Sequence, residues 1–216
     1  MVTLKEFTEV EIIDRIIKGE KPLYEIIVRR YNPYLYKIGR SYNFNHDDTQ
    51  DLMQDTYINA FKSLSQFEKR SNFKTWIIRI MLHNCYHKKQ KSSFKNEITN
   101  EIINENAAPM FTHSNNNTQH EIQNRELGHI LEKTLLTLPE DYRLVFSLRE
   151  INGLSVAETS SLLDISESNV KVRLNRAKAM MRAKIEKSYA AEELFDFNLR
   201  YCNPFTEKVM NIINQL

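Results

Sequence analysis

Apolar residues along this chain recur at helical spacing. Val170, Leu174, Ala177 and Met181 fall at i, i+4, i+7 and i+11, which places them on one face of a helix with basic residues on either side. Only four glycines and five prolines interrupt the 216 residues. We therefore expect an all-α protein.

The segment 154–178 carries the signals of two short helices joined by a tight turn. Ser155 stands three residues before Glu158, so each side chain can satisfy a free amide at the start of the first helix. Residues 164–166 form the turn, and Ser166 can cap the second helix. This arrangement predicts a helix-turn-helix, which places its second helix in the major groove of DNA.

The first turns of that second helix carry side chains that can read DNA. Lysine and arginine donate to guanine or to phosphate, asparagine pairs with adenine, and a valine can meet a thymine methyl group. The alternative is a solvated amphipathic helix, but the capped first helix and the short turn favour DNA binding. The candidate DNA-binding residues are Ser168, Asn169, Lys171, Val172, Arg173, Asn175 and Arg176.

The chain turns polar in its middle, from about Lys91 to Gln123. Asparagine is abundant there, and Pro109 interrupts the segment. The stretch 112–120 is too polar to bury a core, so we expect a flexible linker between two helical blocks.

Several helices are predicted before this linker. One covers 22–40, as a single helix or as a pair bent near Pro33, and the next covers 48–63. A third begins at 71–72 and ends near Lys91. The first twenty residues are expected to form a helix that packs on this block through Ile12, Ile13, Ile16 and Ile17.

Charge is segregated along the last of these helices. Residues 69–91 include seven lysines and arginines, no acidic residue, and aromatic side chains interleaved with the basic ones. This pattern suits a nucleic acid whose bases are partly unstacked. For the rings of Phe73 and Trp76, a place in the hydrophobic core is the better interpretation.

Composition narrows the class of protein further. The formal charge of +2 is nearly neutral, and the two cysteines, Cys85 and Cys202, suggest a reducing compartment without a disulfide framework. The sequence has no signal peptide and no apolar run long enough to span a bilayer, so we expect a cytoplasmic protein. His83 and His87 share a helix face, but they lack further ligands for a metal site. We expect no metal, no cofactor and no catalytic group.

At this point the residues resemble a known family. Asp51-Leu52-Met53-Gln54-Asp55-Thr56 and Phe73-Lys74-Thr75-Trp76 are similar to the promoter-melting domain of bacterial sigma factors. The segments Leu138–Arg143, Glu150–Glu158 and Val170–Ala177 resemble the promoter-binding domain at their C-terminus. Two such domains with a short linker resemble the extracytoplasmic-function (ECF) group of the sigma-70 family.

The resemblance implies four parts. Residues 1–91 would bind core RNA polymerase and the −10 promoter element, residues 92–124 would form the linker, and residues 125–187 would bind the −35 element. Residues 188–216 would be a helical extension of unknown role. The implied partners are core RNA polymerase, promoter DNA and, in many members, an anti-sigma protein.

The resemblance also implies roles for residues of the first domain. The residues that would dock on polymerase are Asp48, Asp51, Gln54, Asp55 and Ile58. Those that would engage and melt the −10 element are Lys69, Arg70, Asn72, Lys74, Trp76, Arg79 and Lys88. Where many members end this helix with arginines, this chain has lysines, which lack the forked donor geometry of arginine.

Two other classes of protein remain as alternatives. A one-component helix-turn-helix regulator would bind duplex DNA without polymerase, commonly as a dimer. A helical scaffold protein would bind DNA weakly or not at all. A one-component regulator would also leave the segment Phe73-Lys74-Thr75-Trp76 unexplained.

Overall fold

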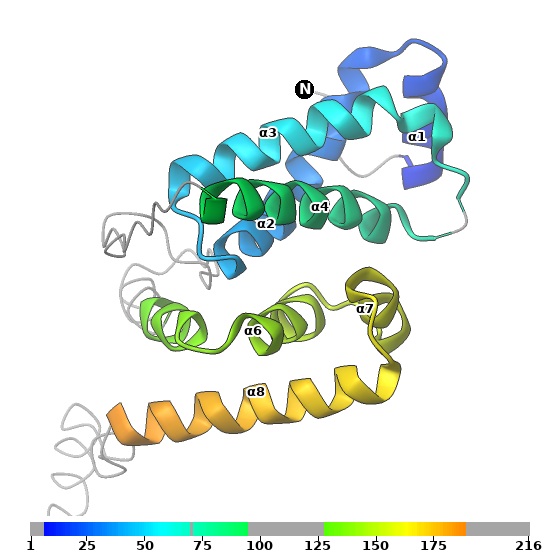
Figure 1. Cartoon of the computed structure of the whole chain (residues 1–216). Coiled ribbons are helices and arrows are strands. Elements are labelled where there is room, and N and C mark those ends of the chain that lie inside the picture. Colours follow the sequence, from blue (N-terminus) through cyan, green and yellow to red (C-terminus); the bar gives the residue numbers. More distant parts are fainter. Residues whose placement is uncertain (1–6, 70, 95–127, 189–216) are drawn as a thin grey trace, which may run out of the picture.

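The computed structural model describes residues 7–69, 71–94 and 128–188, and every regular element within them is a helix (Figure 1). The prediction of an all-α protein is confirmed. The predicted linker and C-terminal extension fall largely or wholly on 95–127 and 189–216, which lie outside the described residues, as does Arg70. The helices of the first block are α1 (Glu9–Ile17), η1 (Lys21–Leu23), α2 (Tyr24–Ser41), α3 (His46–Lys62), η2 (Leu64–Gln66) and α4 (Phe73–Phe94). Those of the second block are residues 128–136, α6 (Glu140–Phe146), η3 (Ser147–Ile151), α7 (Val156–Leu163) and α8 (Glu167–Ser188).

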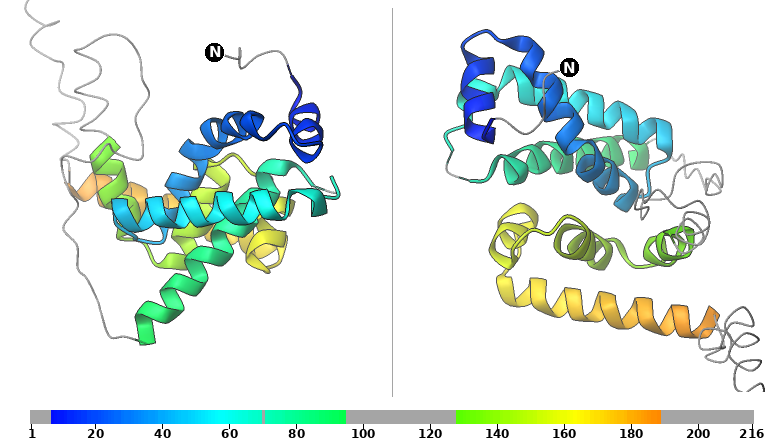
Figure 2. Two further views of the ribbon diagram at one scale, coloured as in Figure 1. Left: turned by 90° about the horizontal axis from the view of Figure 1, so that it is seen from above. Right: turned by 180° about the vertical axis from the view of Figure 1, so that it is seen from behind.

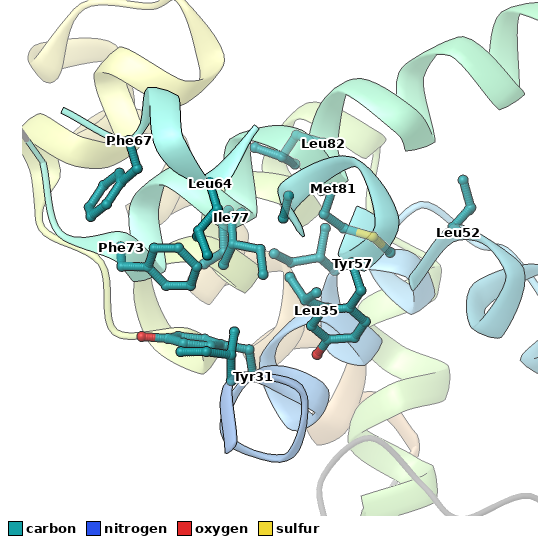
Figure 3. Close-up of a cluster of buried hydrophobic side chains, with 14 of the residues drawn as sticks. Tyr31, Leu35, Leu52, Tyr57, Leu64, Phe67, Phe73, Ile77, Met81 and Leu82 are labelled. Atoms are coloured by element: carbon teal, nitrogen blue, oxygen red, sulfur yellow. The ribbon is translucent and has the colours of Figure 1, made fainter. Parts of the chain in front are cut away.

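Helices α2, α3 and α4 pack pairwise against one another and enclose the core of the first block. Helix α2 runs without interruption past Pro33, so the single-helix alternative is the correct one. Phe73 and Ile77 of α4 meet Tyr31 and Leu35 of α2 in this core (Figure 3). Phe73 is only 1% exposed, which confirms its place in the core.

Helix α1 closes one end of this bundle, as the N-terminal isoleucines predict. Ile12, Ile13 and Ile16 are buried, whereas Ile17 lies on the exposed side of the helix. A capping box formed by Thr8 and Glu11 fixes the start of α1.

The second block contains the predicted helix-turn-helix. Ser155 and Glu158 form the expected capping box at the start of α7. Asp164 ends α7 in the left-handed conformation, with φ 52°, and Ser166 then accepts a hydrogen bond from the amide of Asn169 at the start of α8. The apolar stripe of α8 is buried at Val170, Ala177 and Met181, as its spacing predicts, whereas Leu174 is only partly buried.

The two blocks lie against each other. In Figures 1 and 2, α6 and α7 lie between the first block and α8, which forms the outer layer. Leu144, Leu148 and Leu154 of the second block are buried in the same hydrophobic cluster as the core of the first. Nothing in the sequence predicted this contact.

Candidate nucleic-acid and polymerase interfaces

Helix α8 presents the predicted recognition surface to solvent. Its buried stripe faces α6 and α7, so the opposite face is free. Ser168, Lys171, Val172, Asn175 and Arg176 are exposed there, and Val172 retains 46% of its accessible surface. An exposed valine between polar donors suits a base edge that carries a methyl group.

Two arginines of α8 form polar contacts with side chains of α6. The guanidinium of Arg173 lies 3.1 Å from a carboxylate oxygen of Asp141, and its side chain is mostly covered. Arg176 donates a longer hydrogen bond, 3.4 Å, to the hydroxyl of Tyr142. Arg173 is therefore less free than its position beside the apolar stripe suggested, while Arg176 stays exposed.

Two of the candidate −10 residues, Lys69 and Asn72, lie just before the start of α4, whereas Lys88 lies in its C-terminal half. Asn72 accepts a hydrogen bond from the amide of Lys74 and so shapes the first turn. Lys69 has a positive φ of 58°, and its ammonium group lies 2.8 Å from Asp14 of α1. This exposed ion pair can be exchanged for a phosphate contact at little cost.

Trp76 is half-buried in an aromatic cluster. Its ring centroid lies 5.3 Å from those of both Phe67 and Phe73. The ring therefore packs against the core, and part of its surface is still accessible.

Lys74 and Arg79 are turned toward the second block. The ammonium group of Lys74 lies 3.9 Å from the centroid of the Tyr34 ring and donates to the backbone carbonyl of Asn152. Burial lowers the pKa of Lys74, and the Glu158 carboxylate opposes that shift. Arg79 donates to the hydroxyl of Ser161 at 3.0 Å.

Helix α3 carries the candidate polymerase surface. Asp51, Gln54, Asp55 and Ile58 are exposed, and their spacing places them along one side of the helix. Ile58 keeps 43% of its surface, which adds an apolar residue at the C-terminal end of this acidic surface. Asp48 differs from the others because it pairs with Lys88 of α4, a candidate −10 residue.

The described residues hold no group of three or more potential metal ligands. His83 and His87 are exposed, with their Nε2 atoms 2.9 Å apart, whereas Cys85 is buried. No helix in the described part of the chain is long and apolar enough to cross a bilayer.

Each of the two blocks matches the model of a known protein family. The model of sigma-70 region 2 matches residues 27–94, and the model of sigma-70 region 4 matches residues 128–181. Together they cover more than half of the chain, in the order that the motifs predicted.

The chain belongs to the sigma-70 family, in its ECF group. It is 28% identical to the ECF RNA polymerase sigma-E factor of Haemophilus influenzae over 188 residues, which cover 84% of this chain and 97% of that one. The Escherichia coli protein of the same name is 26% identical, over 84% of this chain and 96% of its own length.

Two solved structures share the fold of this sigma factor. CnrH, in complex with the cytosolic domain of CnrY, matches with a TM-score of 0.57 and 21% identity, covering 82% of this chain and 97% of its own. The sigma factor RpoE of Bartonella quintana, in complex with the anti-sigma factor NepR, also has a TM-score of 0.57, with 22% identity and coverage of 71% and 91%.

With these names, α2, α3 and α4 form region 2, and residues 128–136 with α6, η3, α7 and most of α8 form region 4. The exact domain boundaries remain predictions. The same holds for the residues assigned to the −10 element, the −35 element and polymerase.

The sequence analysis did not identify one residue that joins the two blocks. Arg143 is buried, and its guanidinium donates to the carbonyls of Ser41, Leu136 and Leu138. A buried arginine inside an acidic motif gives no local sign of such a role.

Proposed function

We propose that this sigma factor binds core RNA polymerase, directs it to specific promoters and assists the opening of the duplex. The match of regions 2 and 4 to two separate blocks, each with basic helical residues, is the observation that carries the proposal. A one-component regulator has no use for region 2, so this alternative is disfavoured. The proposal assigns no bond-making step to the sigma factor itself, because polymerase performs the chemistry.

The division of labour follows from the two surfaces. An exposed helix such as α8 suits the major groove of a closed duplex, so we assign it the −35 element. The basic and polar candidates Lys69, Asn72, Lys74 and Arg79, with the half-buried Trp76, suit a backbone whose bases are unpaired, so we assign the −10 element to α4 and the residues just before it. Arg70 and Lys88 belong to the same assignment. Unpairing costs a few kcal/mol per base, which the contacts with DNA and polymerase must offset.

The acidic surface of α3 suits a basic partner. Asp51, Gln54 and Asp55 would meet cationic groups on polymerase, while Ile58 would supply an apolar contact beside them. Asp48 completes this proposed surface once its pair with Lys88 opens. Because polymerase works in the cytoplasm, the sigma factor is proposed to act there.

An anti-sigma protein is the proposed regulator. The solved relative from Bartonella quintana was seen with one, and the described fold matches that relative. A regulator of this kind would limit the fraction of sigma factor that reaches polymerase.

Reconstituted transcription tests the proposed function. Core polymerase alone should initiate without promoter preference, and added sigma factor should produce defined start sites on genomic DNA fragments. Start sites that do not change, together with tight binding of the free chain to duplex DNA, would favour the one-component alternative.

A further inference from the structure

The loop between η2 and α4 is joined to α1 by an ion pair. Both carboxylate oxygens of Asp14 accept hydrogen bonds from the ammonium group of Lys69, at 2.8 and 3.0 Å. The two residues are 55 positions apart, and α1 precedes residue 27, where the match to the region 2 model begins. Helix α1 packs beside η2, so it reaches this loop from outside the matched region (Figure 1).

The two ends of the loop are held within region 2 itself. At the first end, the ring of Phe67 packs edge-on against that of Phe73, with the ring centroids 5.2 Å apart (Figure 3). At the other end, Asn72 accepts a hydrogen bond from the amide of Lys74. Between these ends, Lys69 has a φ of 58°, a left-handed conformation that residues other than glycine rarely adopt without support. The contact with Asp14 supplies support at this residue.

Helix α1 is a rigid support for Asp14. Near its start, Glu9 accepts a hydrogen bond from the hydroxyl of Tyr31 and lies 3.6 Å from the guanidinium of Arg30, both on α2. Near its end, Arg15 donates two hydrogen bonds to the carboxylate of Glu20, at 2.5 and 2.9 Å. These polar contacts add to the buried isoleucines of α1, so the carboxylate of Asp14 is held in place relative to the core of region 2.

The ion pair leaves Lys69 able to contact DNA. An ammonium group has three donors, and the oxygens of Asp14 take two of them. The side chain of Lys69 keeps 44% of its accessible surface, so the third donor can reach a phosphate. The pair therefore need not open when DNA binds, and Asp14 can aim the ammonium group without competing for it.

We infer that Asp14 is a positioning residue for recognition of the −10 element. Through Lys69 it holds the loop between η2 and α4 in the conformation that meets DNA, and it touches no base itself. This role rests on the proposed function, because that function assigns Lys69 and Asn72 to the −10 element. The hold of α1 on the loop does not depend on that assignment.

Positioning and simple electrostatics predict different effects when the carboxylate is removed. Loss of a negative charge near DNA raises the affinity for every sequence alike. Loss of positioning instead lowers the preference for a matched −10 element over a mismatched one. Exposed ion pairs change an equilibrium by at most about fivefold, so we expect Asp14→Asn to reduce this preference by about two- to fivefold.

Hydrogen exchange in the full chain tests the hold of α1 on the loop. Asparagine is close to aspartate in size, so Asp14→Asn should speed amide exchange in peptides that span the loop by about two- to fivefold and leave the middle of α2 unchanged. Glu25→Gln is the matched control, because it weakens another exposed ion pair of region 2, the one with Arg29. Equal exchange of the loop in Asp14→Asn and in this control would overturn the inference.

A charge swap isolates the ion pair from other effects of these substitutions. Lys69→Asp alone places two carboxylates together and should speed exchange of the loop. Adding Asp14→Lys restores a pair of opposite charges and should slow the exchange again. If the second change does not restore protection, the ion pair is not what holds the loop and the inference is overturned.

Promoter selection by the holoenzyme tests the role in recognition. Core polymerase with the full chain transcribes two promoter libraries, one randomised at the −10 element and one at the −35 element, built on a start site found by reconstituted transcription. Asp14→Asn should flatten the −10 preference and leave the −35 preference unchanged, and Glu25→Gln should change neither. An unaltered −10 preference in Asp14→Asn, or an equal rise of transcription from every −10 sequence, would overturn the positioning role.

The two tests also separate this role from the proposed function. If the unaltered chain shows no −10 preference at all, the proposed function fails and the role of Asp14 in recognition fails with it. Hydrogen exchange would still report whether α1 holds the loop.

Discussion

At the scale of single residues, α2 approaches α3 and α4 closely at Gly39. A Cβ atom built there would lie 2.6 Å from Cγ2 of Thr49 and 3.2 Å from Cε of Met81. Thr49 is branched at Cβ and fully buried, so it has few other rotamers to adopt. The glycine is required by a helix that lies elsewhere in the sequence, and no local pattern could predict it.

Gly39→Ala should therefore destabilise the protein although alanine favours helices. Overpacking costs about 1–3 kcal/mol, and the helix propensity of alanine recovers about 1 kcal/mol. We expect a net loss of about 1 kcal/mol in the free energy of urea-induced unfolding. Adding Thr49→Ser removes the clashing methyl group and should recover part of that loss. A fully additive double variant would contradict the close contact.

The sequence predicted side-chain hydrogen bonds correctly where the two bonded residues are close together in the chain. The capping box of Ser155 and Glu158 and the cap of Ser166 were predicted and are confirmed. The second partner of Glu158, Thr75, is 83 positions away. Its hydrogen bond could not be read from the sequence.

At the scale of elements, α3 carries the proposed polymerase surface and α8 carries the proposed −35 surface. Periodicity predicted both helices because burial on one face fixes which side chains remain outside. It did not predict that Asp48 would pair with Lys88, since the alignment of α3 along α4 depends on the packing of the whole block.

The acidic surface of α3 yields a prediction for polymerase binding. Asp51→Lys with Asp55→Lys reverses two exposed charges, so the affinity for core polymerase should fall by tenfold or more, about 1.4 kcal/mol. Titration of dye-labelled sigma factor with core polymerase measures this. Glu186→Lys makes the same type of change on exposed α8 and should have little effect. Unchanged affinity in the α3 variant would remove this surface from the interface.

The exposed face of α8 yields a prediction for salt dependence. Arg176→Gln removes one proposed phosphate contact, so the slope of log affinity against log salt for promoter binding by the holoenzyme should decrease by about one unit. Arg182→Gln, farther along the exposed side of α8, is the matched control. Equal slopes for both variants would rule out Arg176 as a phosphate contact.

At the scale of the whole molecule, the sequence predicted two helical blocks but not their contact. Arg40 and Glu132 are 92 positions apart, and Arg143 lies 102 positions from Ser41. Neither the periodicity of the sequence nor a local motif indicates that these residues are in contact. Leu144, Leu148 and Leu154 of region 4 join the region 2 core, and only the three-dimensional arrangement reveals which core they fill.

The contact between the two blocks should depend on pH through Glu158. Its hydrogen bond from Thr75, then those with Ser155 and the nearby charge of Lys74, hold the pKa of this carboxyl below its ordinary value of 4.5. A depressed pKa means that the contact between the blocks stabilises the fold above pH 4.5 and that this stabilisation is lost as the pH falls through the lowered pKa. The contribution of Glu158 to the free energy of urea-induced unfolding should be flat from pH 7 to about 5 and then decrease. Glu158→Gln should lack this step, and an identical step in that variant would assign it to another group.

Photocrosslinking in an assembled initiation complex tests the central claim most directly. A photoreactive amino acid is placed at exposed His83 of α4 or at exposed Ser168 of α8, and crosslinked bases are mapped on both DNA strands. The account predicts that His83 labels the −10 region and Ser168 the −35 region of the same promoter. Crosslinks from either helix to polymerase alone, with none to DNA, would contradict it.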